Sequence, residues 1–158
     1  MFRKMRRFRQ ELSREDCLQV LERVPRGVLS VLGDDGYPYG VPMDFWYCRE
    51  DGNFYFHGAG EGHKLDAIDR CEKASFCVFD QGWREEGQWA LHIRSVIVFG
   101  KMSRVTDVEK AKQICLELGR RFTEDEAYLA REIEKDGKRV QCLMLETEHM
   151  TGKQVRED

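Results

Sequence analysis

The stretch "FYFHGAGEGHKLDAIDR", residues 54–70, combines residue types that suit the binding of a negatively charged group. Gly58, Gly60 and Gly62 lack side chains, so the backbone there can adopt positive φ and approach a ligand closely. The helix expected to follow directs its unpaired N–H groups and the positive end of its dipole at the turn. Lys64 adds a full charge in the first helical turn, and the pattern predicts a phosphate site.

The motif alone leaves a second interpretation open, a flexible loop ahead of an exposed lysine. It matches neither G-x-x-x-x-G-K-[ST] nor the G-x-G-x-x-G register of a dinucleotide fold. His57, directly before the glycines, is a candidate for proton transfer, because an unperturbed imidazole has a pKa of about 6.5. The alternative is a histidine that only forms a hydrogen bond at a strand end.

The elements that position these residues follow from hydrophobic spacing. "SREDCLQVLERV", residues 13–24, predicts an amphipathic helix with Ser13 as N-cap and Asp16 at the capping-box distance. "GVLSVLGDDGYPYGVPMDFWYC" predicts two strands around an Asp-Gly turn, and "REDGN" predicts a second hairpin into "FYFHG". Three successive strands predict a meander. Pro42 cannot donate a ladder hydrogen bond, so we expect an edge, a bulge, or a backbone that faces a ligand there.

The remaining segments alternate between helix and strand. Residues 62–71 predict a short helix, 73–80 a strand, 89–105 a long strand, 124–137 a charged helix and 139–153 a final strand. "DVEKAKQICLELGRRF" predicts a helix capped by Asp107. Because hairpins rather than helical crossovers join the first strands, we expect an antiparallel β-barrel with peripheral helices, in one domain of 158 residues. The predicted buried face of the Asp107 helix is Val108, Ala111, Ile114, Cys115 and Leu118.

Composition excludes several classes of protein. No apolar run approaches the length of a membrane helix, and no apolar segment follows the basic start as a secretory signal requires. The net charge is −3, so the basic N-terminal arm, residues 1–12, is expected to be solvated rather than to bind nucleic acid.

The six cysteines show no regular spacing. Neither Cys-x-x-Cys nor His-x-x-x-His occurs, so we expect no zinc site. The cysteines are therefore expected to be reduced thiols of a cytoplasmic protein.

Five segments in order resemble the FMN-binding split-barrel proteins related to pyridoxamine 5'-phosphate oxidase, and within them the nitroimidazole-resistance-like branch. The segments are "MRRFRQEL", "YGVPMDFWY", "FYFHGAGEGHKLDAI", "RSVIVFGKMSRV" and "ETEHMTGK", and they extend over nearly the whole chain. The resemblance implies a Greek-key-like split barrel and a homodimer that holds FMN between its subunits.

The resemblance also assigns roles to residues. The backbone of the second strand would border the flavin ring, which accounts for Pro42, while Lys64 would pair with the FMN phosphate. His57 matches a pocket histidine implicated in the chemistry of nitroimidazole-resistance proteins. The residues placed around the cofactor are Val41, Pro42, Met43, Asp44, His57, Gly58, Ala59, Lys64, Leu65, Ser95 and Val96.

The chain departs from the family pattern at two places. Asp44 stands where relatives more often have asparagine, and its charge would disfavour flavin reduction. "DQGWREEGQW" resembles an insertion with two tryptophans.

The implied function is an FMN-dependent oxidoreductase that passes electrons, from NAD(P)H as one possible donor, to a small flat acceptor such as a nitroaromatic. The alternatives are a flavin-binding or storage protein without turnover, and a split barrel that binds haem or a deazaflavin.

Overall fold

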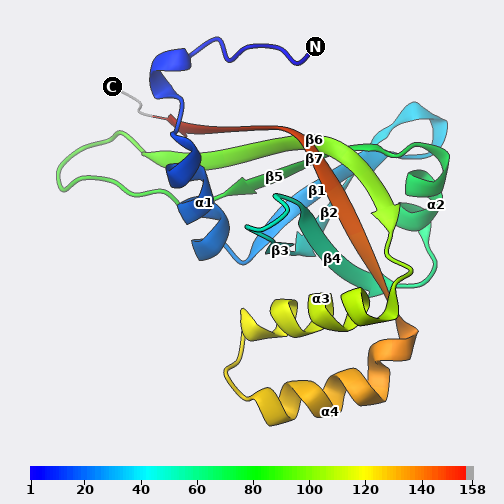
Figure 1. Cartoon of the computed structure of the whole chain (residues 1–158). Helices are drawn as coiled ribbons and strands as arrows, with labels where there is room; N and C mark the ends of the chain where they lie inside the picture. Colours follow the sequence, from blue (N-terminus) through cyan, green and yellow to red (C-terminus); the bar gives the residue numbers. More distant parts are fainter. Residues whose placement is uncertain (156–158) are drawn as a thin grey trace.

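A computed structural model describes residues 1–155 as one curled, fully antiparallel sheet with flanking helices (Figure 1). Its seven strands lie in the order β2-β1-β5-β6-β7-β4-β3. The strands are β1 (Arg26–Leu32), β2 (Pro38–Asp44), β3 (Trp46–Tyr47), β4 (Phe54–Ala59), β5 (Lys73–Phe79), β6 (Ile93–Arg104) and β7 (Val140–Val155). The helices are α1 (Arg14–Arg23), α2 (His63–Arg70), α3 (Val108–Arg120) and α4 (Glu126–Asp136).

The curl of the sheet depends on a bend in the second predicted strand. Phe45 alone separates β2 from β3, yet β2 forms one edge of the sheet and β3 the other. Both predicted hairpins exist, but a simple meander was wrong, because β2 pairs with β1 and β3 pairs with β4. The completely buried Phe45 side chain lies in the core at the bend. The predicted antiparallel split barrel with peripheral helices is confirmed.

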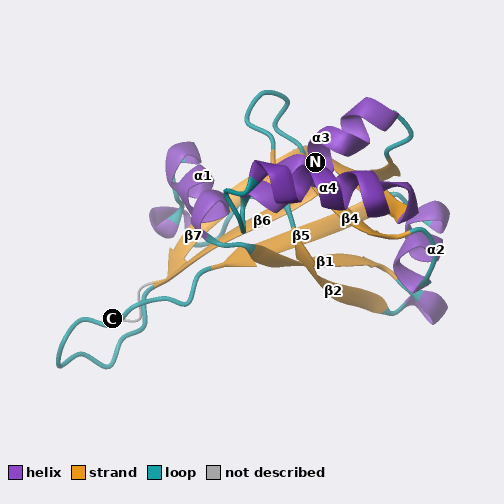
Figure 2. Ribbon diagram, turned by 90° about the horizontal axis from the view of Figure 1, so that it is seen from below, coloured by secondary structure: helices purple, strands orange, loops and turns teal. Residues whose placement is uncertain are grey.

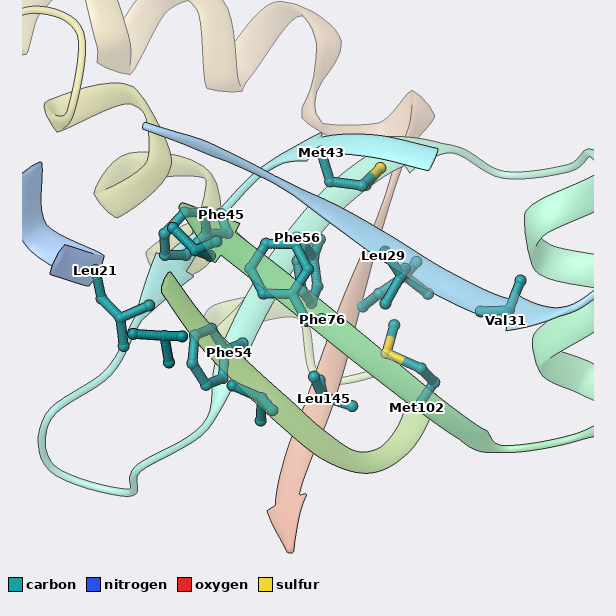
Figure 3. Close-up of a cluster of buried hydrophobic side chains, with 14 of the residues drawn as sticks. Leu21, Leu29, Val31, Met43, Phe45, Phe54, Phe56, Phe76, Met102 and Leu145 are labelled. Carbon is teal, nitrogen blue, oxygen red and sulfur yellow. The ribbon is translucent and has the colours of Figure 1, made fainter. Parts of the chain in front are cut away.

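Aromatic side chains fill the interior of the curl (Figure 3). The rings of Phe45, Phe54 and Phe56 each lie 5.0 to 5.7 Å from the ring of Phe76, in edge-on arrangements. Each of these side chains is completely buried, which contributes about 1.5–3 kcal/mol per ring by removal from water. The core therefore lies where β2, β4 and β5 face one another.

Side chains cap α1 and α3 as the sequence predicts. The Ser13 hydroxyl accepts a hydrogen bond from the backbone N–H of Asp16 at 3.1 Å, and Asp107 caps α3 through the N–H of Lys110 at 2.6 Å. The predicted buried face of α3 was wrong at Val108, the first residue of the helix, which is 65% exposed. α3 and α4 pack side by side, while α1 and α2 lie at opposite ends of the sheet (Figures 1 and 2).

The long sixth strand is shorter than predicted and is locally irregular. β6 begins at Ile93 rather than at residue 89, and residues 80–92 form a loop that projects beyond the sheet (Figure 2). The register of β6 against β7 shifts between Phe99 and Gly100. A Cβ at Gly100 would lie 2.0 Å from the Glu146 carbonyl oxygen, so this close approach requires glycine.

The N-terminal arm is largely exposed, as predicted, but it is partly held against the sheet. The Phe2 ring stacks on the His149 imidazole at 4.7 Å, and the Leu12 N–H donates to the Gly152 carbonyl. In the described part of the chain, no helix has the length and apolar character needed to cross a membrane.

Candidate functional site

The glycine-rich turn brings Lys64 against β2 and β4. The Lys64 ammonium lies 3.4 Å from the Met43 sulfur, a weak acceptor, and a Cβ added at Gly58 would lie 3.1 Å from the same nitrogen. Gly58 therefore leaves room for the lysine head group. Gly62, the N-cap of α2, has φ +126°, so the positive φ expected in the turn occurs at Gly62 but not at Gly58 or Gly60.

Lys64 carries a charge without a protein counter-ion. It is half-buried, and burial lowers the pKa of its ammonium. Among the ion pairs of residues 1–155, none involves Lys64. Because a partly desolvated cation is stabilised by an anion, this position suits a negatively charged ligand.

His57 lies between two opposite charges. The protein packed around this exposed side chain lowers the pKa of its imidazole by partial desolvation; the negative charge of Asp44 raises it and Lys64 lowers it further. The net shift is downward, so the imidazole is mainly neutral at neutral pH. His57, Asp44, Lys64 and Met43 thus form one electrostatic group where β2, β4 and α2 meet.

Arg26 forms an ion pair with Asp44, and this pairing was not predicted from the sequence. The Arg26 Nε donates to the Asp44 Oδ1 at 2.6 Å across the β1–β2 register. The negative charge of Asp44 should therefore disfavour the reduction of a nearby flavin ring less than the sequence indicated. The only sequence signal was the hairpin itself, which places residues 26 and 44 opposite each other.

Arg104 is a second residue that sequence reasoning missed. It lies at the end of β6, donates to the Gly60 carbonyl at 3.3 Å, and forms an ion pair with Asp69 of α2 at 2.7 Å. Arg104 thereby connects the glycine-rich turn with α2, the helix that follows.

Three predicted residues do not join this group. Leu65 and Val96 are buried in the core, so their side chains contribute packing rather than ligand contacts. Ser95 pairs with Phe79 and lies nine residues before Arg104, which contacts α2; nine residues of strand span roughly 30 Å. Val41, Pro42 and Ala59 remain on the strands that flank Lys64.

The clefts on the described surface include two that lie beside the end of α1. One, of about 510 Å³, is lined by Pro42 with residues 23–28 and 79–81, and it reaches the start of the projecting loop. The other, of about 520 Å³, lies between α1, β3 and α3 and contains no predicted site residue. Neither cleft is lined by Lys64 or His57; in the single chain the His57 side chain is exposed and Lys64 is half-buried.

An apolar row crosses the outer face of the sheet from the edge strand that carries the site. The outer row consists of Pro42, Val28, Cys77 and Ile97, which are register partners on β2, β1, β5 and β6. Ile97 is 42% exposed, and Phe79 beside the row is 55% exposed. Such an exposed apolar patch is typical of an interaction surface.

The fold and the basic turn define a class of protein before any comparison. They describe an antiparallel split barrel with a cation at the rim, next to an edge strand that contains proline. The chain belongs to the pyridoxamine 5'-phosphate oxidase family, because the family model of that description matches residues 13–154. Among curated proteins, none matches the chain.

Solved structures share this fold at low sequence identity. A proposed 5-nitroimidazole antibiotic resistance protein from Bacteroides thetaiotaomicron has a TM-score of 0.77 and 19% identity over 94% of this chain and 89% of its own. An FAD-binding protein from Mesorhizobium loti has a TM-score of 0.63 and 21% identity over 92% and 96%. An FAD- and haem-binding protein from Mycobacterium smegmatis has a TM-score of 0.75 and 20% identity over 94% and 74%. Identities this low establish similarity of fold alone.

Proposed function

We propose that the chain is an FMN-binding oxidoreductase, and the observation that carries this proposal is the unpaired, half-buried Lys64 beside the glycine-rich turn. The residues present fit a flavin phosphate on two counts. Gly58 leaves open the space that a side chain would occupy next to the ammonium, and the α2 N-terminus supplies free N–H groups. The structural neighbours that bind flavin support the same cofactor class.

The remaining roles follow from position. Lys64 would hold the phosphate beside Gly58 and Ala59, and the edge-strand backbone from Val41 to Asp44 would border the ring. When bound, the flavin supplies the transfer of hydride or electrons. The neutral imidazole of His57 can accept a proton or hold a hydrogen bond at the same rim. The proposed acceptor is small and flat, such as a nitroaromatic.

The proposed assembly is a homodimer with FMN at the subunit interface. The outer row offers an apolar surface that continues into Pro42, at the edge of the site. Ser95 lies on the same outer face as Ile97, so it would approach the site of a second copy rather than its own. A dimer would also enclose the Lys64 site.

The first test is the visible spectrum of the purified protein, followed by anaerobic addition of NADH or NADPH. We expect flavin bands that bleach with the nicotinamide and return with a nitroaromatic acceptor. The released cofactor, identified by mass, distinguishes FMN from FAD. His57→Gln should keep the bands and lose acceptor turnover.

The other outcomes separate the alternatives. Flavin bands that no donor bleaches would indicate a binding or storage protein, and an intense haem band would indicate a different cofactor. A colourless protein that does not bind added FMN would overturn the proposal.

A further inference from the structure

Two cysteines that are far apart in the sequence meet between α3 and β7. The Cys115 and Cys142 sulfurs lie 3.8 Å apart, although 27 positions separate the residues. Cys142 belongs to a small apolar cluster with Cys48, Tyr55, Ile114 and Leu118, and Cys115 packs against this cluster. No sulfur contact of Cys48 with either thiol occurs among the described residues. The site group around Lys64 does not use either thiol.

The two thiols have different environments. Cys142 is 1% exposed, and the Ala111 carbonyl oxygen, 3.6 Å from its sulfur, is an alternative acceptor for its single S–H proton. Cys115 is only partly buried. The hydrogen bond from Cys142 lowers the pKa of the Cys115 thiol, whereas that interaction and burial raise the pKa of Cys142. The less buried residue thus carries the more nucleophilic sulfur, with a protonated thiol beside it.

The remaining cysteines lack this arrangement. In the part of the chain that the structure describes, no other pair of sulfurs forms a contact. Burial raises the pKa of both Cys17 and Cys77, which disfavours their thiolates. A low-pKa, accessible thiol next to a resolving thiol is the arrangement that favours reversible oxidation.

We propose that Cys115 and Cys142 form a redox-active pair that a hydroperoxide oxidises to a disulfide. The Cys115 thiolate attacks one peroxide oxygen and the O–O bond breaks, which leaves a sulfenic acid and a hydroxide that takes the proton released by Cys115. The Cys142 sulfur then attacks the sulfenic sulfur. The S–S bond forms, the S–O bond breaks, and the hydroxyl leaves as water with the Cys142 proton. Two thiols lose two electrons, and hydrogen peroxide is reduced to two waters.

Formation of the disulfide requires only a small movement and would connect α3 to β7. The sulfurs must approach from 3.8 Å to about 2.0 Å, a movement within the range of side-chain rotation. Cys142 is the register partner of His57 in the β4–β7 ladder. The disulfide would therefore fix α3 to the strand position directly opposite His57.

The test treats the reduced full-length protein with a small excess of hydrogen peroxide, blocks the remaining thiols with N-ethylmaleimide, and measures the intact mass and the peptide map. We expect the number of blocked thiols to fall by two and the Cys115 and Cys142 peptides to be joined, with full reversal by a phosphine reductant. In Cys142→Ala, Cys115 should stop at the sulfenic acid and be labelled by dimedone.

Cys71→Ser is the matched control, because Cys71 is a partly exposed thiol without a sulfur neighbour among residues 1–155. This variant should lose two thiols as the wild type does, whereas Cys115→Ser should lose none. An unchanged thiol count in the wild type, a disulfide that maps to other cysteines, or equal oxidation of Cys115→Ser would each overturn the proposal. Cys115 is partly exposed, so its variant provides a test even if a change at buried Cys142 impairs folding.

Discussion

Replacing Lys64 by methionine should weaken FMN binding without destabilising the fold. Lys64→Met keeps an unbranched apolar side chain as far as Cε and removes the ammonium group with its charge and its hydrogen-bond donors. In the structure the ammonium contacts the Met43 sulfur and has no carboxylate partner among the described residues. Binding and stability should therefore change independently.

The magnitudes follow from these contacts. A hydrogen bond to a charged group contributes about 1.5–3 kcal/mol, which corresponds to a roughly 10- to 150-fold weaker FMN affinity. Burial already lowers the pKa of the ammonium, so loss of the charge removes a desolvation cost. For a half-buried group we expect less than about 1 kcal/mol of stabilisation, and a Tm that is unchanged or raised by roughly 2–4 °C.

Riboflavin makes the assay specific, because it carries the flavin ring without the phosphate. Fluorescence titrations of the apoprotein should show weaker FMN binding by Lys64→Met and unchanged riboflavin binding. Lys112→Met, on the exposed side of α3, is the matched control and should change neither. An equal loss for both ligands, or a fall in Tm, would show that Lys64 acts through the fold and would refute the assignment.

Three further changes test the interface, the histidine and the core. Ile97→Glu introduces a charge into the outer row and should convert a dimer to a monomer in light-scattering measurements; a monomeric wild type would contradict the proposed assembly. The pKa of His57 is lowered on folding, so its contribution to stability is present above about pH 6.5 and is lost as the pH falls. The Tm of His57→Gln should therefore fall less than the Tm of the wild type between about pH 7.5 and 5.5. Arg121 donates to two carbonyls at the end of α1, so Arg121→Met should cost about 1–3 kcal/mol in thermal unfolding. The neighbouring change Arg120→Met removes exposed ion pairs and should lower the Tm much less.

The sequence predicted features that depend on neighbouring residues. The Ser13 and Asp107 caps and the hairpin turns are set by a few adjacent positions, and all are present. Pro42 was correctly expected at an edge because a missing N–H is a local property. The start of the sixth strand was predicted at residue 89, but the apolar residues before Ile93 lie in a projecting loop.

Features that depend on distant contacts could not be predicted from the same signals. The bend at Phe45 arises because its ring is packed against Phe54 and Phe76 from other strands. The Arg26–Asp44 ion pair required the hairpin register, and the Cys115–Cys142 contact required the packing of α3 on β7. Regular cysteine spacing, the usual sequence signal, is absent.

The split of the predicted cofactor residues between two surfaces is the main structural argument for two copies of the chain. Lys64 and His57 lie at the junction of β2, β4 and α2, whereas Ser95 lies at the far end of β6. Nine residues of strand separate Ser95 from Arg104, which contacts α2, so we expect Ser95 and Lys64 of one chain to lie too far apart to contact the same phosphate. The outer row, however, connects the edge of the Lys64 site to the strand face that carries Ser95. A symmetric pair that buries this row would place both sets of residues at one interface, so loss of the dimer in Ile97→Glu should also weaken FMN binding.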